Sequence, residues 1–201
     1  MPVSAARKPD PPAVEISDQA AANLRFIRDT LERSSAFTSV PGWGGVGMGI
    51  VGLAAAAAAW RLTGRDWLAV WLAAAALAMT IGLLAMVRKA RRAGLSLLAG
   101  PGSRFAIGFA APCLAGAALT AASAAAGRFD HLAGTWLLLY GAAVVAGGVL
   151  SVRPVLELGA GVMALGVLAL LFPAAGNAWL GLGFGLLQIV AGWVIARRHG
   201  G

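Results

Sequence analysis

The sequence predicts an all-α membrane protein, with six transmembrane helices arranged as three helical hairpins and preceded by a cytoplasmic amphipathic helix. Six apolar stretches carry this prediction, because a hydrocarbon core of ~30 Å is crossed by about 20 helical residues. The chain is 59% hydrophobic and 12% charged, whereas soluble domains are about 25% charged. The predicted transmembrane domain, 44–201, contains the stretches 44–62, 66–87, 105–126, 132–151, 155–172 and 178–196.

The chain before the first stretch divides into a tail and a helix. Residues 1–16 contain four prolines among charged side chains, which predicts a disordered tail. Residues 17–43 predict an amphipathic juxtamembrane helix, over 17–35, and a turn. Its apolar residues at helical spacing are Ala20, Leu24, Ile27 and Leu31. The helix is expected either to lie in the membrane interface or to dock on a cytoplasmic partner or a second copy of the chain.

An internal repeat predicts the hairpins. Every second apolar stretch begins with Trp-Leu and ends at an arginine, and the stretch before each is rich in Gly and Ala. Three equal units of this kind suggest three hairpins in a row. The repeated positions are Trp67-Leu68, Trp136-Leu137 and Trp179-Leu180 at the start, and Arg88, Arg153 and Arg197 at the end.

The basic residues predict the orientation. Thirteen of the 16 Lys and Arg residues fall on one side, and three, Arg61, Arg65 and Arg128, fall on the other. The positive-inside rule therefore predicts a multi-pass protein of the bacterial inner (plasma) membrane with both termini cytoplasmic. Tryptophans at the ends of the stretches predict aromatic belts. They are Trp60, Trp67, Trp71, Trp136 and Trp179 on the outer side, and Trp43 and Trp193 on the inner side.

Composition also excludes several classes of protein. The net charge of +8 comes from arginines at helix ends, which meet anionic lipid headgroups, so we expect the lipid bilayer and no nucleic acid as partner. His131 and His199 fall on opposite faces of the membrane and Cys113 lies too deep to join them, so no metal or cofactor is expected. No histidine falls in a span, so no Ser–His dyad and no enzymatic activity are expected.

Two polar residues in the stretches, Glu157 and Gln188, are candidates for a functional role. Glu157 lies four residues after Arg153 and forms either a boundary ion pair or a carboxylate that couples protons or ions. Gln188 lies in the last stretch and is either a helix-packing residue or faces a pore or ligand. It shares one helical stripe with Gly181, Gly185 and Gly192, and the first stretch has a similar stripe with Gly45 and Gly49. Small residues of this kind predict close helix packing.

Two segments resemble known groups. Gly161-Val-Met-Ala-Leu-Gly166 through Pro173, followed by Leu182-Gly-Phe-Gly-Leu-Leu-Gln through Gly192, resembles the repeat of the HdeD-type membrane proteins. That resemblance implies a six-helix bacterial inner-membrane protein associated with acid stress. The segment 23–34, with Phe37-Thr38 and Gly42-Trp-Gly, is similar to the start of a group of bacterial six-span proteins that has no assigned activity.

Two functional hypotheses follow. The first is a non-enzymatic accessory, scaffold or stress-related membrane protein that forms oligomers through its Gly/Ala helix faces and the 17–35 helix. The alternative is a small transporter or channel with Glu157 and Gln188 near its pathway, which requires a water-accessible cavity at one of these side chains.

Overall fold

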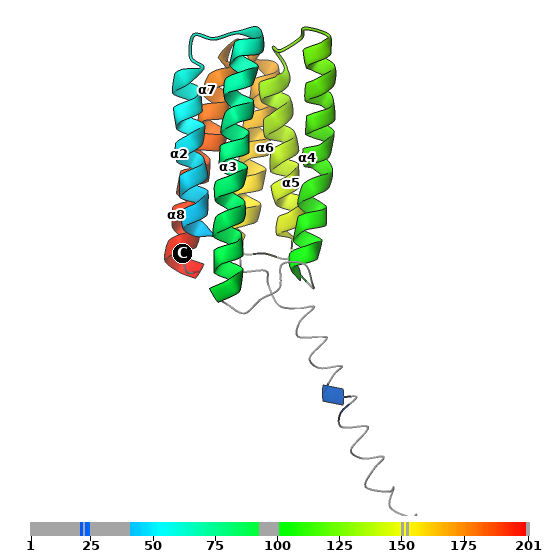
Figure 1. Ribbon diagram of the computed structural model, residues 1–201, viewed down its shortest axis with the longest axis vertical. Coiled ribbons are helices and arrows are strands. Elements are labelled where there is room, and N and C mark those ends of the chain that lie inside the picture. Colours follow the sequence, from blue (N-terminus) through cyan, green and yellow to red (C-terminus); the bar gives the residue numbers. More distant parts are fainter. Residues whose placement is uncertain are drawn as a thin grey trace, which may run out of the picture. The chain divides into compact units, whose positions relative to one another are not determined.

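The computed structural model describes residues 21, 23, 24, 41–92, 101–149, 151 and 153–199 (Figure 1). The chain divides into two units, Met1–Ser35 and Ala36–Gly201. In the first unit the described residues Ala21, Asn23 and Leu24 are helical, and Leu24 is 67% exposed. The whole of the predicted tail (1–16) and the rest of the predicted amphipathic helix (17–35) lie outside the described residues.

The second unit is all-helical and contains six helical rods in its described residues, which confirms the predicted all-α class. Each rod overlaps one apolar stretch. The first five are α2 (Gly42–Ala58), α3 (Gly64–Arg92), α4 (Pro101–Ala125), α5 (Leu132–Gly148) and α6 (Arg153–Leu171). The last rod joins η1 (Pro173–Ala175), α7 (Gly176–Leu180), η2 (Gly181–Leu187) and α8 (Gln188–His199).

Four of the six rods are long and apolar enough to cross a membrane. They are α3, the part of α4 from Gly102 to Ala125, α6, and the last rod from Pro173 to Arg198. The other two, α2 and α5, are apolar but have only 17 residues each.

Local chemistry explains where the helices start and end. Gly64 and Gly127 have φ angles of 61° and 65° in the turns before α3 and after α4, a conformation that glycine adopts without a steric penalty. Asp66 lies in the first turn of α3, and Lys89, Arg91 and Arg92 lie in its last turn, so both ends complement the helix dipole.

The last rod departs from the single regular helix that the sequence predicts. Residues Gly181–Leu187 form a π-helix between two α-helical segments. Glycines 181, 183 and 185 are all buried there, so the backbone of the wide turn is in direct contact with its neighbours. By contrast, α4 continues through Pro112.

The rods lie side by side in a definite order. α2 contacts α3 on one flank and α8 and η2 on the other, while α5 contacts α4 on one flank and α6 on the other. α6 in turn contacts η2 and α8, which joins the two halves of the bundle (Figure 1). These contacts link the rods in the order α3, α2, last rod, α6, α5 and α4, and α3 also meets α5 through the stacked rings of Trp67 and Trp136.

Glycines bring α2 and the last rod into backbone contact. A methyl group added at Gly45 would lie 3.1 Å from the Cα of Gly192, and one added at Gly49 would lie 2.7 Å from the carbonyl oxygen of Gly185. One added at Gly181 would lie 3.0 Å from a side chain of α2, the Cβ of Ala56. The five glycines that the sequence marks as packing residues therefore share a single interface.

A second glycine interface joins α5 to α6. A methyl group at Gly141 would lie 2.7 Å from the carbonyl oxygen of Gly159, and one at Gly166 would lie 2.7 Å from the amide nitrogen of Leu138. These glycines are not part of the packing stripes that the sequence predicts. Their signal is a seven-residue spacing, which places glycines 134, 141 and 148 of α5 on one face and glycines 159 and 166 of α6 on another.

We predict that Gly49→Ala and Gly192→Ala each lower the free energy of unfolding by ~1–3 kcal/mol, the usual cost of overpacking. Their new methyl groups would meet backbone atoms, the carbonyl oxygen of Gly185 at 2.7 Å and the amide nitrogen of Val46 at 2.6 Å. Backbone of a packed helix cannot rotate away as a side chain does. Unfolding of the purified protein in detergent measures the effect.

Gly161→Ala is the matched control. Its methyl group would make an ordinary contact of 3.4 Å with a side-chain carbon of Leu187, and alanine gains about 1 kcal/mol of helix propensity over glycine. This variant should unfold at the wild-type temperature or above it. Equal destabilisation by all three variants would contradict the glycine interface.

Candidate functional site

Glu157 and Arg153 form an exposed pair at the start of α6. The Nε of Arg153 donates to Oε1 of Glu157 at 3.0 Å, and the two side chains are 89% and 64% exposed respectively. An exposed pair four residues apart on a helix contributes about 0–1 kcal/mol. This geometry favours the boundary ion pair over a coupling carboxylate, because coupling groups in membrane helices face the bundle interior or an enclosed cavity.

Gln188 lies inside the bundle and is held by a tyrosine. Its side chain belongs to the few buried polar groups, with 7% exposure, and its Oε1 accepts a hydrogen bond from the hydroxyl of Tyr140 at 3.3 Å. The ring of Tyr140 meets Phe184 and Phe109 edge-on, with ring centroids 5.1 and 5.9 Å apart. These contacts connect the last rod to α5 and α4, which favours a packing role for Gln188 over a pore-facing one.

Asn177 is a polar residue that the sequence analysis missed. Its Oδ1 accepts hydrogen bonds from the indole nitrogens of Trp67 and Trp71 at 3.2 and 3.1 Å. Its Nδ2 donates to the carbonyl oxygen of Ala56 at 2.8 Å. One amide thus ties α7 to α2 and α3. The sequence contains a signal in retrospect, because Asn177 stands alone among apolar residues, two positions before Trp179 of its hairpin repeat.

These bonds correct the expected position of two tryptophans. Trp67 and Trp71, which the sequence places in the outer belt, are only 8% and 3% exposed. Trp67 also stacks on Trp136 with ring centroids 5.3 Å apart. A buried indole N–H needs an acceptor, and Asn177 supplies it. Trp60, by contrast, is 67% exposed, as a residue of the belt should be.

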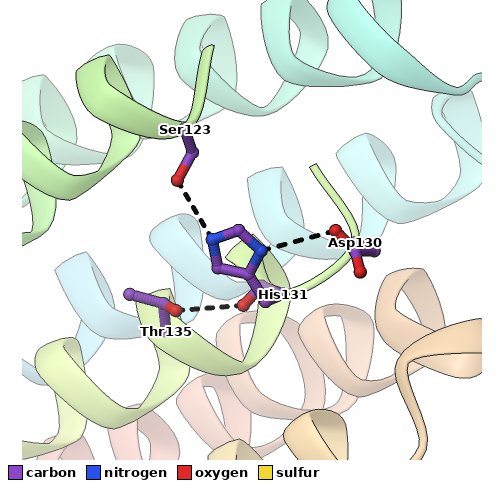
Figure 2. Close-up of polar contacts among 4 residues, drawn as sticks. All are labelled: Ser123, Asp130, His131 and Thr135. Atoms are coloured by element: carbon purple, nitrogen blue, oxygen red, sulfur yellow. Dashed lines mark hydrogen bonds and ion pairs between the residues drawn. The ribbon is translucent and has the colours of Figure 1, made fainter. Parts of the chain in front are cut away.

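The turn between α4 and α5 brings Ser123, His131 and Asp130 together (Figure 2). The hydroxyl oxygen of Ser123 lies 3.0 Å from Nε2 of His131, and Nδ1 of His131 lies 3.4 Å from Oδ1 of Asp130. The expectation that the chain has no serine–histidine pair is therefore wrong. The pair forms because the short turn folds His131 back over the last helical turn of α4.

The order of atoms resembles a nucleophile, base and acid, but the surroundings differ from those of an active serine. Ser123 is only 6% exposed. Ser123 lies near the C-terminal end of α4, where the helix carbonyl groups carry a negative partial charge. This charge would destabilise the oxyanion that forms during acyl transfer. An ionised carboxylate only accepts hydrogen bonds, so Nδ1–H of His131 donates to Asp130, and in the neutral imidazole the bare Nε2 then accepts from Ser123.

Further hydrogen bonds at this turn show what the cluster does. The indole nitrogen of Trp136 on α5 donates to the hydroxyl of Thr120 on α4 at 2.7 Å. The hydroxyl of Thr135 donates to the carbonyl oxygen of His131 at 3.0 Å (Figure 2). The Ser123–His131 and Thr120–Trp136 bonds both run from α4 to α5, so the cluster closes one end of this hairpin.

The comparisons with known proteins add no family. Searches against models of protein families, against curated proteins and against solved structures found no match to this chain. Within the described residues, no group of three or more His, Cys, Asp and Glu side chains is placed to hold a metal ion.

We predict that Asn177→Leu lowers the free energy of unfolding by ~1–3 kcal/mol, because it leaves buried indole N–H groups without an acceptor. Tryptophan fluorescence in detergent should also change, since Trp67 and Trp71 lose their shared hydrogen-bond partner. Thr80→Val is the control, because Thr80 is exposed and bonds only within its own helix, to the carbonyl of Ala76. A wild-type unfolding curve for Asn177→Leu would refute the role of the amide.

The hydrogen bond from His131 lowers the pKa of the Asp130 carboxyl below its usual value of 3.8. A depressed pKa stabilises the folded state above the unfolded pKa, and this contribution is lost as pH falls through the folded pKa. We predict that His131→Ala raises the pKa of Asp130 toward 3.8, as followed by carboxyl NMR during an acid titration. Ser123→Ala should shift it less, and an unchanged value in His131→Ala would exclude the bond.

Proposed function

We propose that this chain is an integral membrane protein with six transmembrane helices, and that it serves as a non-enzymatic accessory or scaffold protein. The exposed surface of the flanking helices carries the proposal. In α3, and likewise in α4, only 6% of the most apolar 18-residue stretch is buried inside the structure. Large apolar side chains cover the rest, among them Leu72, Leu77, Leu83 and Leu84 on α3 and Ile107, Leu114 and Leu119 on α4. A soluble monomer rarely exposes such patches, whereas lipid covers them without cost.

The positions of the two short rods support six spans. A helix of 17 residues is about 25 Å long and meets the lower limit of about 17 residues for a span. α2 and α5 each lie between two other rods and carry many of the buried glycines. Because neighbours pack against two sides of each, less of their surface needs to match the thickness of the bilayer.

Charge at the two ends supports cytoplasmic termini. Among the described residues, eight cations and one carboxylate lie at the end of the bundle where α2 starts and α8 stops, whereas three cations and two carboxylates lie at the opposite end. The first set is Arg88, Lys89, Arg91, Arg92, Arg104, Arg153, Arg197, Arg198 and Glu157, and the second is Arg61, Arg65, Arg128, Asp66 and Asp130. The positive-inside rule places the first end in the cytoplasm.

The side chains favour a scaffold over a transporter. The two residues that the transporter hypothesis needs are otherwise engaged, Glu157 in an exposed ion pair and Gln188 in a buried bond to Tyr140. The glycine stripes that suggested self-association are also used within one chain. An oligomer would therefore need another face, and both the oligomer and the HdeD-type resemblance stay predictions.

Reporter fusions test the spans and their orientation. We predict that alkaline phosphatase is active when fused within the turns at residues 60–63, 127–131 and 172–175, and inactive at residues 93–100 and at the C-terminus. Green fluorescent protein fused at the same points should give the opposite pattern. A pattern of fusion activities in which α2 and α5 do not cross the membrane would overturn the proposal. So would a chain that stays dissolved without detergent.

Activity-based labelling tests the absence of enzymatic function. The purified protein should not react with a fluorophosphonate probe, because Ser123 is buried and faces helix carbonyls. Ser123→Ala is the matched control. Labelling of the wild type that disappears in Ser123→Ala would replace the scaffold proposal with a serine hydrolase.

A further inference from the structure

The described cations at this end of the bundle come from four of the six rods, namely α3, α4, α6 and the last rod. A methyl group added at Gly44 in the first turn of α2 would lie 2.6 Å from Cβ of Ala85 in α3, and one added at Gly42 would meet the backbone of Ala196 in α8. The cations of α3 begin one turn beyond Ala85, and those of α8 begin at Arg197. They therefore flank the start of α2 from both sides.

The other three rods continue this surface. A methyl group at Gly108 of α4 would lie 3.0 Å from the carbonyl oxygen of Ala146 in α5, and one at Gly148 of α5 would lie 2.8 Å from a side-chain carbon of Val155 in α6. These contacts bring the starts of α4 and α6, with Arg104 and Arg153, to the same end.

Among the residues that the structure describes, the arginines of this surface are exposed and mostly without carboxylate neighbours. All seven are exposed to solvent, and Glu157, the single described acid at this end, pairs with Arg153. Like charges gathered at one end repel each other unless counter-ions neutralise them. The folded bundle therefore leaves a multivalent site for anions.

Exposed tryptophans fix the depth of this site. Trp43 in the first turn of α2 is 62% exposed, and Trp193, one turn before the arginines of α8, is 46% exposed. The guanidinium of Arg197 lies 4.7 Å from the centre of the Trp193 ring. Indoles prefer the headgroup level of a bilayer, so the guanidinium groups lie level with lipid phosphates, which their forked N–H donors bind well.

We propose that this end of the bundle binds the headgroups of anionic phospholipids, in preference to zwitterionic ones, in the leaflet on the side of both termini. The inference rests on the proposed membrane function and goes beyond the positive-inside rule. A charge that only directs insertion needs no arrangement in the folded state, whereas a lipid surface needs exposed guanidinium groups at the depth of the phosphates.

The test uses the full chain in nanodiscs that contain equal amounts of phosphatidylglycerol and phosphatidylcholine, and native mass spectrometry of the lipids that stay bound. Phosphatidylglycerol should be enriched on the wild type. Each nearby cation favours an anionic surface roughly fivefold, so the variant Arg88→Gln/Arg197→Gln/Arg198→Gln should lose at least about fivefold of that enrichment. The control, Arg61→Gln/Arg65→Gln/Arg128→Gln, removes the same charge from the opposite end and should keep it.

Two outcomes overturn the inference: equal retention of both lipids by the wild type, or equal losses in the two triple variants. If the first triple variant fails to insert, the wild type still decides, because its enrichment must fall as salt screens the charges. A chain that never enters the nanodisc would refute the membrane function instead. A chain that inserts without headgroup preference refutes only the lipid site.

Discussion

Close backbone contact between glycine faces is the interaction on which the rest of this bundle depends. In lipid, apolar side chains gain nothing by leaving the solvent, so helices associate through van der Waals contact and hydrogen bonds. Gly49 against Gly185, and Gly141 against Gly159, leave no room for a methyl group between the helices. These two seams hold the central rods, and α3 and α4 then attach to the outside of α2 and α5.

Hydrogen bonds between side chains supply the specificity that glycines lack. Asn177 joins three helices at one level of the bundle, and the Tyr140–Gln188 bond joins two helices at another. The Ser123–His131 and Thr120–Trp136 bonds close the α4–α5 hairpin. Each of these bonds fixes one helix against another, which supports the proposed scaffold over a catalyst or a conduit.

The sequence predicts those features that depend on residues close together in the chain. The length of each apolar stretch predicts six helices, and a spacing of four residues predicts the Arg153–Glu157 pair. It cannot predict features that depend on distant pairing. Asn177 lies 110 residues from Trp67, and hydropathy does not distinguish an indole that faces lipid from one that donates to a buried amide. For the same reason, the glycine stripes were visible but their partners were not.

The wide turn of η2 has a consequence for the spacing of residues along the last rod. A π-helix accommodates an additional residue relative to an α-helix, and each residue of an α-helix turns the following chain by about 100°. The residues that precede and follow Gly181–Leu187 therefore share one face of the last rod only because this segment is wound as a π-helix. Rewinding the same seven residues as a regular α-helix would turn Gln188 away from Tyr140 and Gly192 away from α2. In this rod, the more regular backbone would give the less well-packed protein.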